Sequence, residues 1–314
     1  SRQRQMCIRD SCHPYVLKEM EAARLEDPRR RIERFDDLLF SHVGYSIRNA
    51  VRSLFLGLSF GKFTIVPHDR KTAKYYKKLT RYSAALAFVS DVSMLVLGGK
   101  MKQKEHLSAR LGDVLSLLYI SSAMLKRYEA QGRPAADQAI LAWAFHDAIY
   151  RIQIALQRVV DNFPSRPMRS LLSFVVFPFG RRERAPGDRL THRVAQMLLT
   201  PSDARDRLSQ GVFTSAESGH PVNTMEEALP LVIQAEPLER KLLKALKKGE
   251  IVGITWEQQL KDALEKSVVS KEEAAILNHV RELVMEIIAV DEFTTEEMAA
   301  GRKPQPPMDT QHAA

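Results

Sequence analysis

Few residues of this chain have the types and spacing that chemistry requires. Glu217 and His220 have the Glu-x-x-His spacing of di-iron centres in helical bundles, which need two such pairs and two further glutamates. The sequence contains no second pair with this spacing, and this pair lies between helical patterns. We therefore predict no metal site.

One histidine stands next to a carboxylate within a helical pattern. His146 and Asp147 would suit acid–base chemistry, because imidazole titrates near neutral pH. Adjacent residues of a helix point about 100° apart, however, so the two side chains do not share one site, and we interpret His146 as structural. The sequence also lacks the GxGxxG and GxxxxGK[ST] loops that hold phosphates. We predict no catalytic residue in this chain.

Three charged residues fall on helices that the apolar pattern places in a bundle: Asp91, Arg110 and Asp113. Charges inside a bundle must be paired, because desolvation of an unpaired ion costs on the order of several kcal/mol. We interpret the three as an interhelical ion-pair network that fixes the register of the helices. The alternative is that they contact a group outside this chain.

Four apolar stripes with helical spacing predict the helices that carry these residues. Short turns at residues 98–99 and 131–134 make neighbouring helices antiparallel, so we predict an all-α chain with an antiparallel four-helix bundle within residues 12–163. The segment around Asp91 is apolar nearly all round, and we interpret it as a core helix. The stripes are Phe35, Leu39, Val43, Ile47, Val51, Leu54 and Leu58; Tyr82, Leu86, Val89 and Val96 with Ala85, Phe88, Val92 and Leu95; Leu107, Leu111, Val114, Leu118, Leu125 and Tyr128; and Ala142, Phe145, Ile149, Ile152, Leu156, Val159 and Phe163.

The length of 314 residues allows a second unit after the bundle. Four prolines within residues 164–187 predict an irregular connector there. We predict a unit of short helices over residues 188–300. The supporting signals are capping-box pairs at Thr224 and Glu227, Thr255 and Gln258, and Ser270 and Glu273, with Pro237 at a first helical position and Gly249 at a helix end.

The two ends of the chain differ from the rest. Residues 1–11 lack helical periodicity and resemble a translated cloning linker. Residues 301–314 are polar and rich in proline, which predicts a disordered tail.

An apolar run from Leu171 to Phe179 lies between groups of arginines. It is too short to span a bilayer. Its phenylalanines would enter the headgroup region of a membrane while the flanking arginines meet anionic lipid, which gives peripheral attachment. The alternative is a segment buried between the bundle and the C-terminal unit. The residues concerned are Phe174, Phe177, Phe179, Arg181 and Arg182.

Several short stretches, in a shared order along residues 13–277, resemble the large bacterial acyl-CoA dehydrogenases of fatty-acid β-oxidation, in the region that follows their dehydrogenase core. The stretches include residues 13–20 (HPYVLKEM), 90–94 (SDVSM), 97–99 (LGG), 108–113 (SARLGD), 125–128 (LKRY), 161–164 (DNFP) and 270–274 (SKEEA).

The resemblance implies FAD as the cofactor, a medium- or long-chain fatty acyl-CoA as the substrate, and an electron-transfer partner. In this family the flavin site and the catalytic glutamate precede residue 13, and no residue of this chain matches that motif. The resemblance therefore implies that this chain is inactive without the upstream dehydrogenase core. It also implies a cytoplasmic protein, with homo-oligomers and peripheral contact with the inner membrane as further expectations.

A net charge of +9 suggests an anionic partner, either nucleic acid, a membrane surface or a phosphate-bearing ligand. Residues 262–284 resemble a helix-turn-helix, but Glu272 and Glu273 at the start of the second helix would repel phosphate, so we favour a packed αα-hairpin and expect no nucleic acid. Two cysteines do not make a disulfide framework, which favours a reducing cytoplasm. A noncatalytic docking or assembly module and a basic nucleic-acid binder remain as alternatives.

Overall fold

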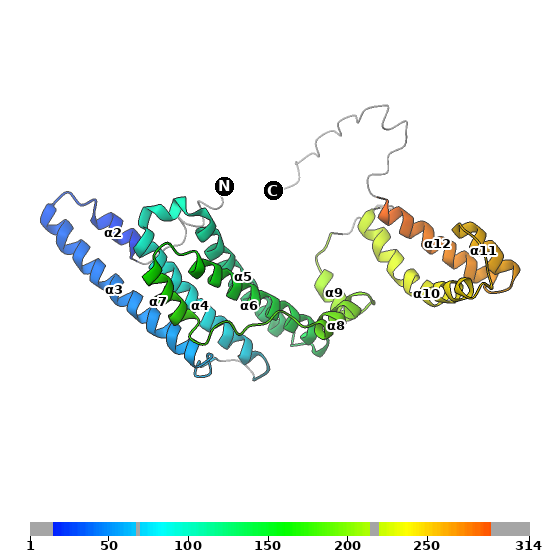
Figure 1. The fold of residues 1–314 in the computed structure, drawn as a ribbon, viewed down its shortest axis with the longest axis horizontal. Helices are drawn as coiled ribbons and strands as arrows, with labels where there is room; N and C mark the ends of the chain where they lie inside the picture. The colour runs from blue at the N-terminus through cyan, green and yellow to red at the C-terminus, as the bar shows by residue number, and fades with distance from the viewer. Residues whose placement is uncertain (1–14, 67–69, 214–219, 290–314) are drawn as a thin grey trace, which may run out of the picture. The chain divides into compact units, whose positions relative to one another are not determined.

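The described part of the chain is built from helices (Figure 1). The structure, a computed structural model, describes residues 15–66, 70–213 and 220–289. Within these ranges every regular element is helical, which confirms the predicted all-α class. The elements are α2 (Val16–Ala22), α3 (Pro28–Leu58), α4 (Arg70–Leu97), η1 (Gly98–Gln103), α5 (Glu105–Ala130), η2 (Ala135–Asp137), α6 (Gln138–Asp161), α7 (Arg166–Val176), α8 (Asp188–Leu198), α9 (Asp203–Ser209), α10 (Pro221–Lys247), α11 (Trp256–Glu265) and α12 (Lys271–Ile288).

The chain divides into two compact units between Val194 and Ala195. In the first unit, α4 contacts α3, α5 and α6, and α5 packs on α6. α7 packs on both α3 and α6. The described helices of this unit thus form a larger assembly than the predicted four-helix bundle.

The core of the first unit follows the apolar spacing of α4, α5 and α6. The stripe from Phe145 to Phe163 is buried along its length, and Ile152 and Leu156 are fully enclosed. By length and composition α4 could cross a membrane, but 56% of its most apolar window is buried inside the unit. Its Asp91 is also fully buried. α4 is therefore a core helix of this unit, as its sequence predicts, but the predicted stripe residues Leu95 and Val96, near its C-terminal end, are exposed.

The side of α3 that is buried in the core is not the side that its apolar stripe predicts. Asp27 caps its N-terminus by accepting a hydrogen bond from the Arg29 backbone, with Pro28 in the first turn. The buried residues of α3 include Leu38, His42 and Leu56, whereas the predicted core residues Val43, Ile47, Val51 and Leu58 are exposed. The prediction of a buried stripe is wrong for these four residues, because the polar contacts of α3 set its rotation.

The predicted irregular connector over residues 164–187 is wrong for its first half, which forms α7. Pro167 lies in the first turn of α7, where proline is tolerated because its missing N–H would have no helical partner. α7 ends at Val176, and Pro178 then packs on Gly57 of α3. A Cβ atom at Gly57 would lie 3.1 Å from the Pro178 ring, so the two segments approach closely.

The second unit contains one helix longer than the pattern predicts. α10 continues through Pro230 and Pro237, so Pro237 does not begin a helix and Thr224 does not cap one. The N-cap of α10 is His220, whose Nδ1 accepts a hydrogen bond from the Val222 backbone at 3.3 Å. Gly249 ends the helix as predicted, with a φ of 70° that suits glycine.

The other two predicted capping boxes are present. Thr255 with Gln258 opens α11, and Ser270 with Glu273 opens α12. α12 packs on both α10 and α11, and the shared core includes Ala235, Leu242, Leu260 and Leu277. Residues 262–284 are therefore part of a packed αα-hairpin. Glu217 and residues 1–11 and 301–314 lie outside the described residues, and the predictions for them stay predictions.

The burial of Ile152 predicts the effect of removing it. Ile152→Ala should lower the free energy of unfolding by about 2–5 kcal/mol, because it deletes fully buried methyl groups and leaves a cavity. Chemical denaturation measures the loss. Ile120→Ala is the matched control, since Ile120 is half-exposed and should change stability by within about 0.5 kcal/mol. Equal losses in the two variants would contradict the assignment of the core.

Candidate functional site: an arginine-bearing strap and a buried histidine

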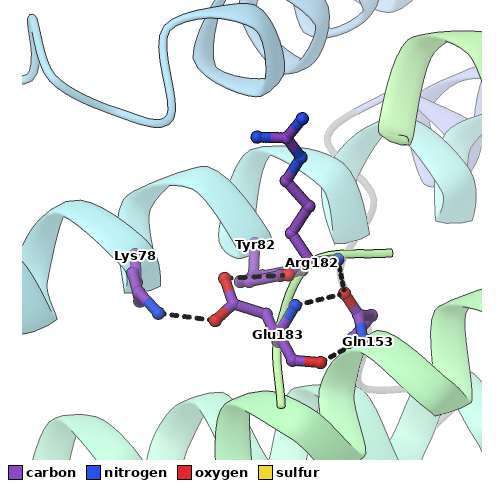
Figure 2. A network of polar contacts seen from close by, with 5 residues as sticks. All are labelled: Lys78, Tyr82, Gln153, Arg182 and Glu183. Carbon is purple, nitrogen blue, oxygen red and sulfur yellow. Dashed lines mark hydrogen bonds and ion pairs between the residues drawn. The ribbon is translucent and has the colours of Figure 1, made fainter. Parts of the chain in front are cut away.

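The segment that links α7 to α8 is anchored to the bundle by one glutamine. We call residues 177–184 the strap. Gln153 of α6 is buried, and its Oε1 accepts hydrogen bonds from the backbone N–H groups of Arg182, at 2.8 Å, and Glu183, at 2.9 Å. Its Nε2 donates to the Glu183 carbonyl at 3.1 Å (Figure 2). One side chain thus satisfies three backbone groups and fixes the path of the strap.

The Glu183 carboxylate ties the strap to α4 as well. Lys78 donates to one carboxylate oxygen, and the Tyr82 hydroxyl donates to the other at 3.4 Å (Figure 2). Burial raises the pKa of the Tyr82 hydroxyl, and the negative charge of Glu183 raises it further while Arg81 opposes the shift. Tyr82 therefore stays protonated and remains a donor.

Two arginines and two phenylalanines meet above this anchor. The rings of Phe60 and Phe179 are stacked, with centroids 5.5 Å apart and planes 19° apart. The Arg182 guanidinium lies 5.2 Å from the centroid of Phe60 and 5.5 Å from that of Phe179. On the bundle side, Arg81 lies 5.7 Å from the Phe60 centroid. These are cation–π distances, so the aromatic pair contacts the exposed Arg182 guanidinium, and Phe60 also contacts the buried Arg81.

The loop after α3 presents Phe60 to this cluster through an uncommon backbone conformation. Phe60 has a φ of 52°, and Gly61 follows with a φ of 71°. A Cβ atom at Gly61 would lie 2.9 Å from the Lys77 carbonyl oxygen, so only glycine fits there. The position of Phe60 thus depends on its neighbour, and no apolar period marks it in the sequence.

The five residues predicted for a membrane or interdomain contact differ in how exposed they are. Phe177 is buried in the core of the first unit, whereas Phe174, on α7, is 62% exposed. Phe179 is half-exposed, and Arg181 and Arg182 are exposed. Phe179 and Arg182 come together as described, but with Phe60 and Arg81, which no pattern in the sequence indicates.

A shallow pocket lies between α6 and α7, next to the strap. Arg169 on its wall donates to the Phe163 carbonyl at 3.1 Å. The pocket is open along most of its rim, whereas a flavin needs a cleft that buries most of its surface. The residues of this pocket therefore do not fit FAD. Its lining is Val160, Asp161, Arg169, Ser170, Ser173, Phe174, Phe177 and Pro178.

A second polar cluster is buried where α2, α3 and α4 meet. His42 lies between two carboxylates, with Nδ1 at 2.8 Å from Glu19 Oε1 and Nε2 at 2.8 Å from Asp91 Oδ1. The ring stacks on Tyr15 with centroids 5.5 Å apart. His42 thus bridges Glu19 of α2 and Asp91 of α4, and the cluster joins three helices.

The predicted network of Asp91, Arg110 and Asp113 is not formed. Asp91 contacts His42 of α3, and Arg110 donates instead to the Arg158 carbonyl of α6 at 3.4 Å. Asp113 is exposed. Asp91 and Arg110 therefore serve different helix pairs. The partner of Asp91 is His42. His42 lies on the buried side of α3, which the apolar stripe had predicted to be the exposed side.

His146 and Asp147 do not act as a pair. Asp147 forms an ion pair with Arg151, one turn away, at 2.9 Å. Burial lowers the pKa of His146, and the positive charges of Lys78 and Lys74 lower it further. The negative charge of Glu183 opposes this shift but does not reverse it, so His146 is neutral at physiological pH.

The anchoring by Gln153 predicts a local effect of removing its amide. Gln153→Leu should expose the strap to proteases. Three backbone groups lose their hydrogen bonds to Gln153, and they find new partners only if the strap moves into water. Limited digestion with trypsin should cleave after Arg181, Arg182 or Arg184 several times faster than in the unmodified chain.

Gln157→Leu is the matched control, since Gln157 bonds within its own helix to Asp161. Cleavage of the strap at the same rate in both variants would show that Gln153 does not hold it.

Two comparisons with known proteins bear on this chain. A family model described as acyl-CoA dehydrogenase, C-terminal, bacterial type, matches residues 10–293. No solved structure matches the chain.

Proposed function

Since the chain belongs to the bacterial-type acyl-CoA dehydrogenase C-terminal family, we propose that it is the C-terminal portion of an enzyme that introduces the α,β-double bond into medium- or long-chain fatty acyl-CoA. The acyl-CoA dehydrogenase family is FAD-dependent in general, and its reaction belongs to fatty-acid β-oxidation. In this proposal the flavin, the acyl-CoA and the catalytic glutamate lie in a dehydrogenase core that precedes these residues. An electron-transfer partner then reoxidises the flavin.

We further propose that the first unit of this chain is a noncatalytic docking element for an anionic membrane surface. The surface that carries the proposal consists of Phe174, Phe179, Arg169, Arg181 and Arg182, all of which are exposed. We call it the strap surface. Phenylalanines that enter the headgroup region and arginines that meet lipid phosphates are the two components of peripheral attachment.

The geometry of α7 supports this role. With eleven residues the helix is too short to cross a bilayer. Its inner side, which includes Leu172, Val175 and Val176, is buried in the core of the unit. Leu171 and Phe174 are left on the exposed side. The helix can therefore lie on a membrane without losing its packing.

The anchored strap supports the same role by keeping two arginines in place. Gln153 and Glu183 fix the backbone at Arg182, and the aromatic pair holds its guanidinium. An arginine that is already ordered loses less side-chain entropy when it binds a phosphate. The proposed location is therefore the cytoplasm, peripheral to the inner membrane.

A second candidate role for the strap surface is contact with the upstream dehydrogenase core. Exposed phenylalanines next to arginines also suit a protein interface, where aromatic residues and arginine are enriched. Attachment to lipid vesicles separates the two roles, because the core is absent from such an experiment.

The membrane role predicts binding of the chain to anionic vesicles in a flotation assay. Phe174→Ser with Phe179→Ser should release the protein, because both side chains are exposed and supply the apolar contact. Arg181→Glu with Arg182→Glu should weaken binding most at low salt, since salt already screens the electrostatic attraction at high ionic strength.

Matched controls come from exposed residues elsewhere in the first unit. Tyr119→Ser removes an exposed aromatic ring of α5, and Arg189→Glu with Arg193→Glu reverses two charges of α8. Neither control should change flotation as strongly. A wild-type chain that ignores anionic vesicles would refute the membrane role and leave contact with the core as the role of the strap surface.

The enzymatic part of the proposal predicts that the chain alone purifies without flavin and reduces no dye when fatty acyl-CoA is added. The physical reason is that the pocket beside the strap does not fit FAD, and that the proposal places the catalytic glutamate in the upstream core. Visible absorption spectra and a dye-reduction assay provide the measurement. A stoichiometric flavin in the purified chain would contradict this assignment.

A further inference from the structure

Arg81 of α4 carries a buried charge that the described part of the chain does not neutralise. The residue is only 7% exposed. Its guanidinium lies 5.7 Å from the centroid of the Phe60 ring and 5.2 Å from that of the Tyr82 ring. Among the described residues, no carboxylate forms an ion pair with it and no acceptor forms a hydrogen bond with it. Buried ions are normally paired, so this one calls for a partner.

The two aromatic rings do not replace such a partner. A guanidinium has five N–H donors in a planar fork. Ring faces attract its charge, but they offer no oxygen that accepts these hydrogen bonds. The loss of water around a buried ion also costs more than a cation–π contact commonly returns. Arg81 therefore has donors left for an acceptor that comes from outside the described chain.

The loop after α3, which carries Phe60, holds further donors. Ser59 Oγ and Thr64 Oγ1, on either side of Phe60 in the sequence, are buried and have no hydrogen-bond partner within the described ranges. Lys77 of α4 donates to the Lys62 carbonyl at 2.9 Å, which adds positive charge at the same loop. The loop and the neighbouring turns of α4 therefore combine positive charge with donors that lack an acceptor.

The strap brings a second guanidinium to the same ring. Arg182 lies 5.2 Å from the Phe60 centroid. Figure 2 shows its side chain pointing away from Gln153 and Glu183. The Glu183 carboxylate is bonded instead to Lys78 and to the Tyr82 hydroxyl. Because Arg182 is exposed, a ligand reaches the Phe60 ring and its two arginines from the solvent side.

We propose that Arg81 and Arg182 bind the phosphate group of a phosphorylated ligand beside Phe60, between the loop after α3 and the strap. We call this the Arg81 site. A guanidinium fork fits two oxygens of either a phosphate or a carboxylate. The two forks here come from different segments, however, and a tetrahedral phosphate offers oxygens in several directions, whereas the two oxygens of a carboxylate share one plane. A phosphate monoester also carries nearly two negative charges at neutral pH, which two arginines balance.

A lipid headgroup and a small soluble ester both supply such a phosphate. The half-exposed ring of Phe179 lies 5.5 Å from the Arg182 guanidinium and offers an apolar surface to the rest of either ligand. The inference rests on the contacts of Arg81 and not on the membrane role of the strap surface.

Binding of inorganic phosphate to the whole chain tests the Arg81 site. Isothermal titration calorimetry at constant ionic strength should show that phosphate binds and that acetate binds at least tenfold more weakly. Arg81→Met should raise the Kd for phosphate at least tenfold, because it removes the fork and keeps an apolar stem. Arg182→Met should raise the Kd severalfold. Arg110→Met is the matched control, since Arg110 is a half-buried arginine of α5, and it should leave the Kd unchanged.

Thermal melting separates phosphate binding from a purely structural role of Arg81. Phosphate should raise the melting temperature of the wild type above its value in chloride, because a ligand that binds only the folded state stabilises it. The same phosphate should not raise the melting temperature of Arg81→Met. If Arg81→Met does not fold, the exposed Arg182→Met and the conservative Arg81→Lys, which keeps the charge but loses the fork, carry the comparison.

Vesicles of phosphatidic acid distinguish the two sources of the phosphate. Inorganic phosphate should release the chain from these vesicles in a flotation assay when the headgroup is the ligand. Attachment that ignores both inorganic phosphate and Arg81→Met, in a chain that binds phosphate in the calorimeter, assigns the site to a soluble ester. A chain that binds phosphate but no vesicle supports the Arg81 site and refutes only the membrane role.

Three results would overturn the proposal. The first is a wild-type chain that binds no phosphate and melts at the same temperature in phosphate and in chloride. The second is an equal Kd for phosphate in the wild type and in a folded Arg81→Met or Arg81→Lys variant, which would place the anion elsewhere. The third is acetate that binds as tightly as phosphate.

Discussion

A buried charge needs a partner, and in this protein that requirement decides how α3 faces its neighbours. His42 is enclosed between Glu19 and Asp91, with both ring nitrogens 2.8 Å from a carboxylate oxygen. Breaking such a set by turning α3 would leave ions uncompensated in the core, which costs about 3–5 kcal/mol in comparable cases. The rotation of α3 is therefore fixed by ion pairing, and this rotation leaves the apolar stripe on the exposed side of the helix.

The same principle, applied to backbone groups, fixes the strap. The chain between α7 and α8 has no regular structure, yet it runs over the core, where unpaired N–H and C=O groups would be costly. Gln153 satisfies three of these groups, and Glu183 adds bonds to Lys78 and Tyr82 on α4. These hydrogen bonds hold the irregular segment in one conformation, and they keep Arg182 and Phe179 next to each other.

These polar anchors leave apolar side chains exposed at two places on the first unit, at the strap and along the outward side of α3. The strap surface combines exposed phenylalanines with arginines, and the outward side of α3 carries the exposed apolar residues Phe40, Val43, Ile47, Val51, Phe55 and Leu58. In the proposed function, the strap surface is the part of this unit that meets an anionic membrane. The second unit has its own core around α10 and α12, and its pairs of polar residues serve mainly as helix caps.

The sequence by itself determined the helical class, the buried seams of α5 and α6, and the caps at Thr255 and Ser270, because these features depend on local spacing. It also determined the family, through short stretches in a shared order. It did not determine which side of α3 is buried, that residues 166–176 are helical, or that α10 continues through two prolines. Only the tertiary structure decided those points, because each depends on contacts distant in sequence. His42 of α3 pairs with Asp91, the segment that ends α7 packs on Gly57 through Pro178, and α10 packs on α12. Apolar periodicity shows which residues share one side of a helix, but long-range polar contacts decide which side faces the core.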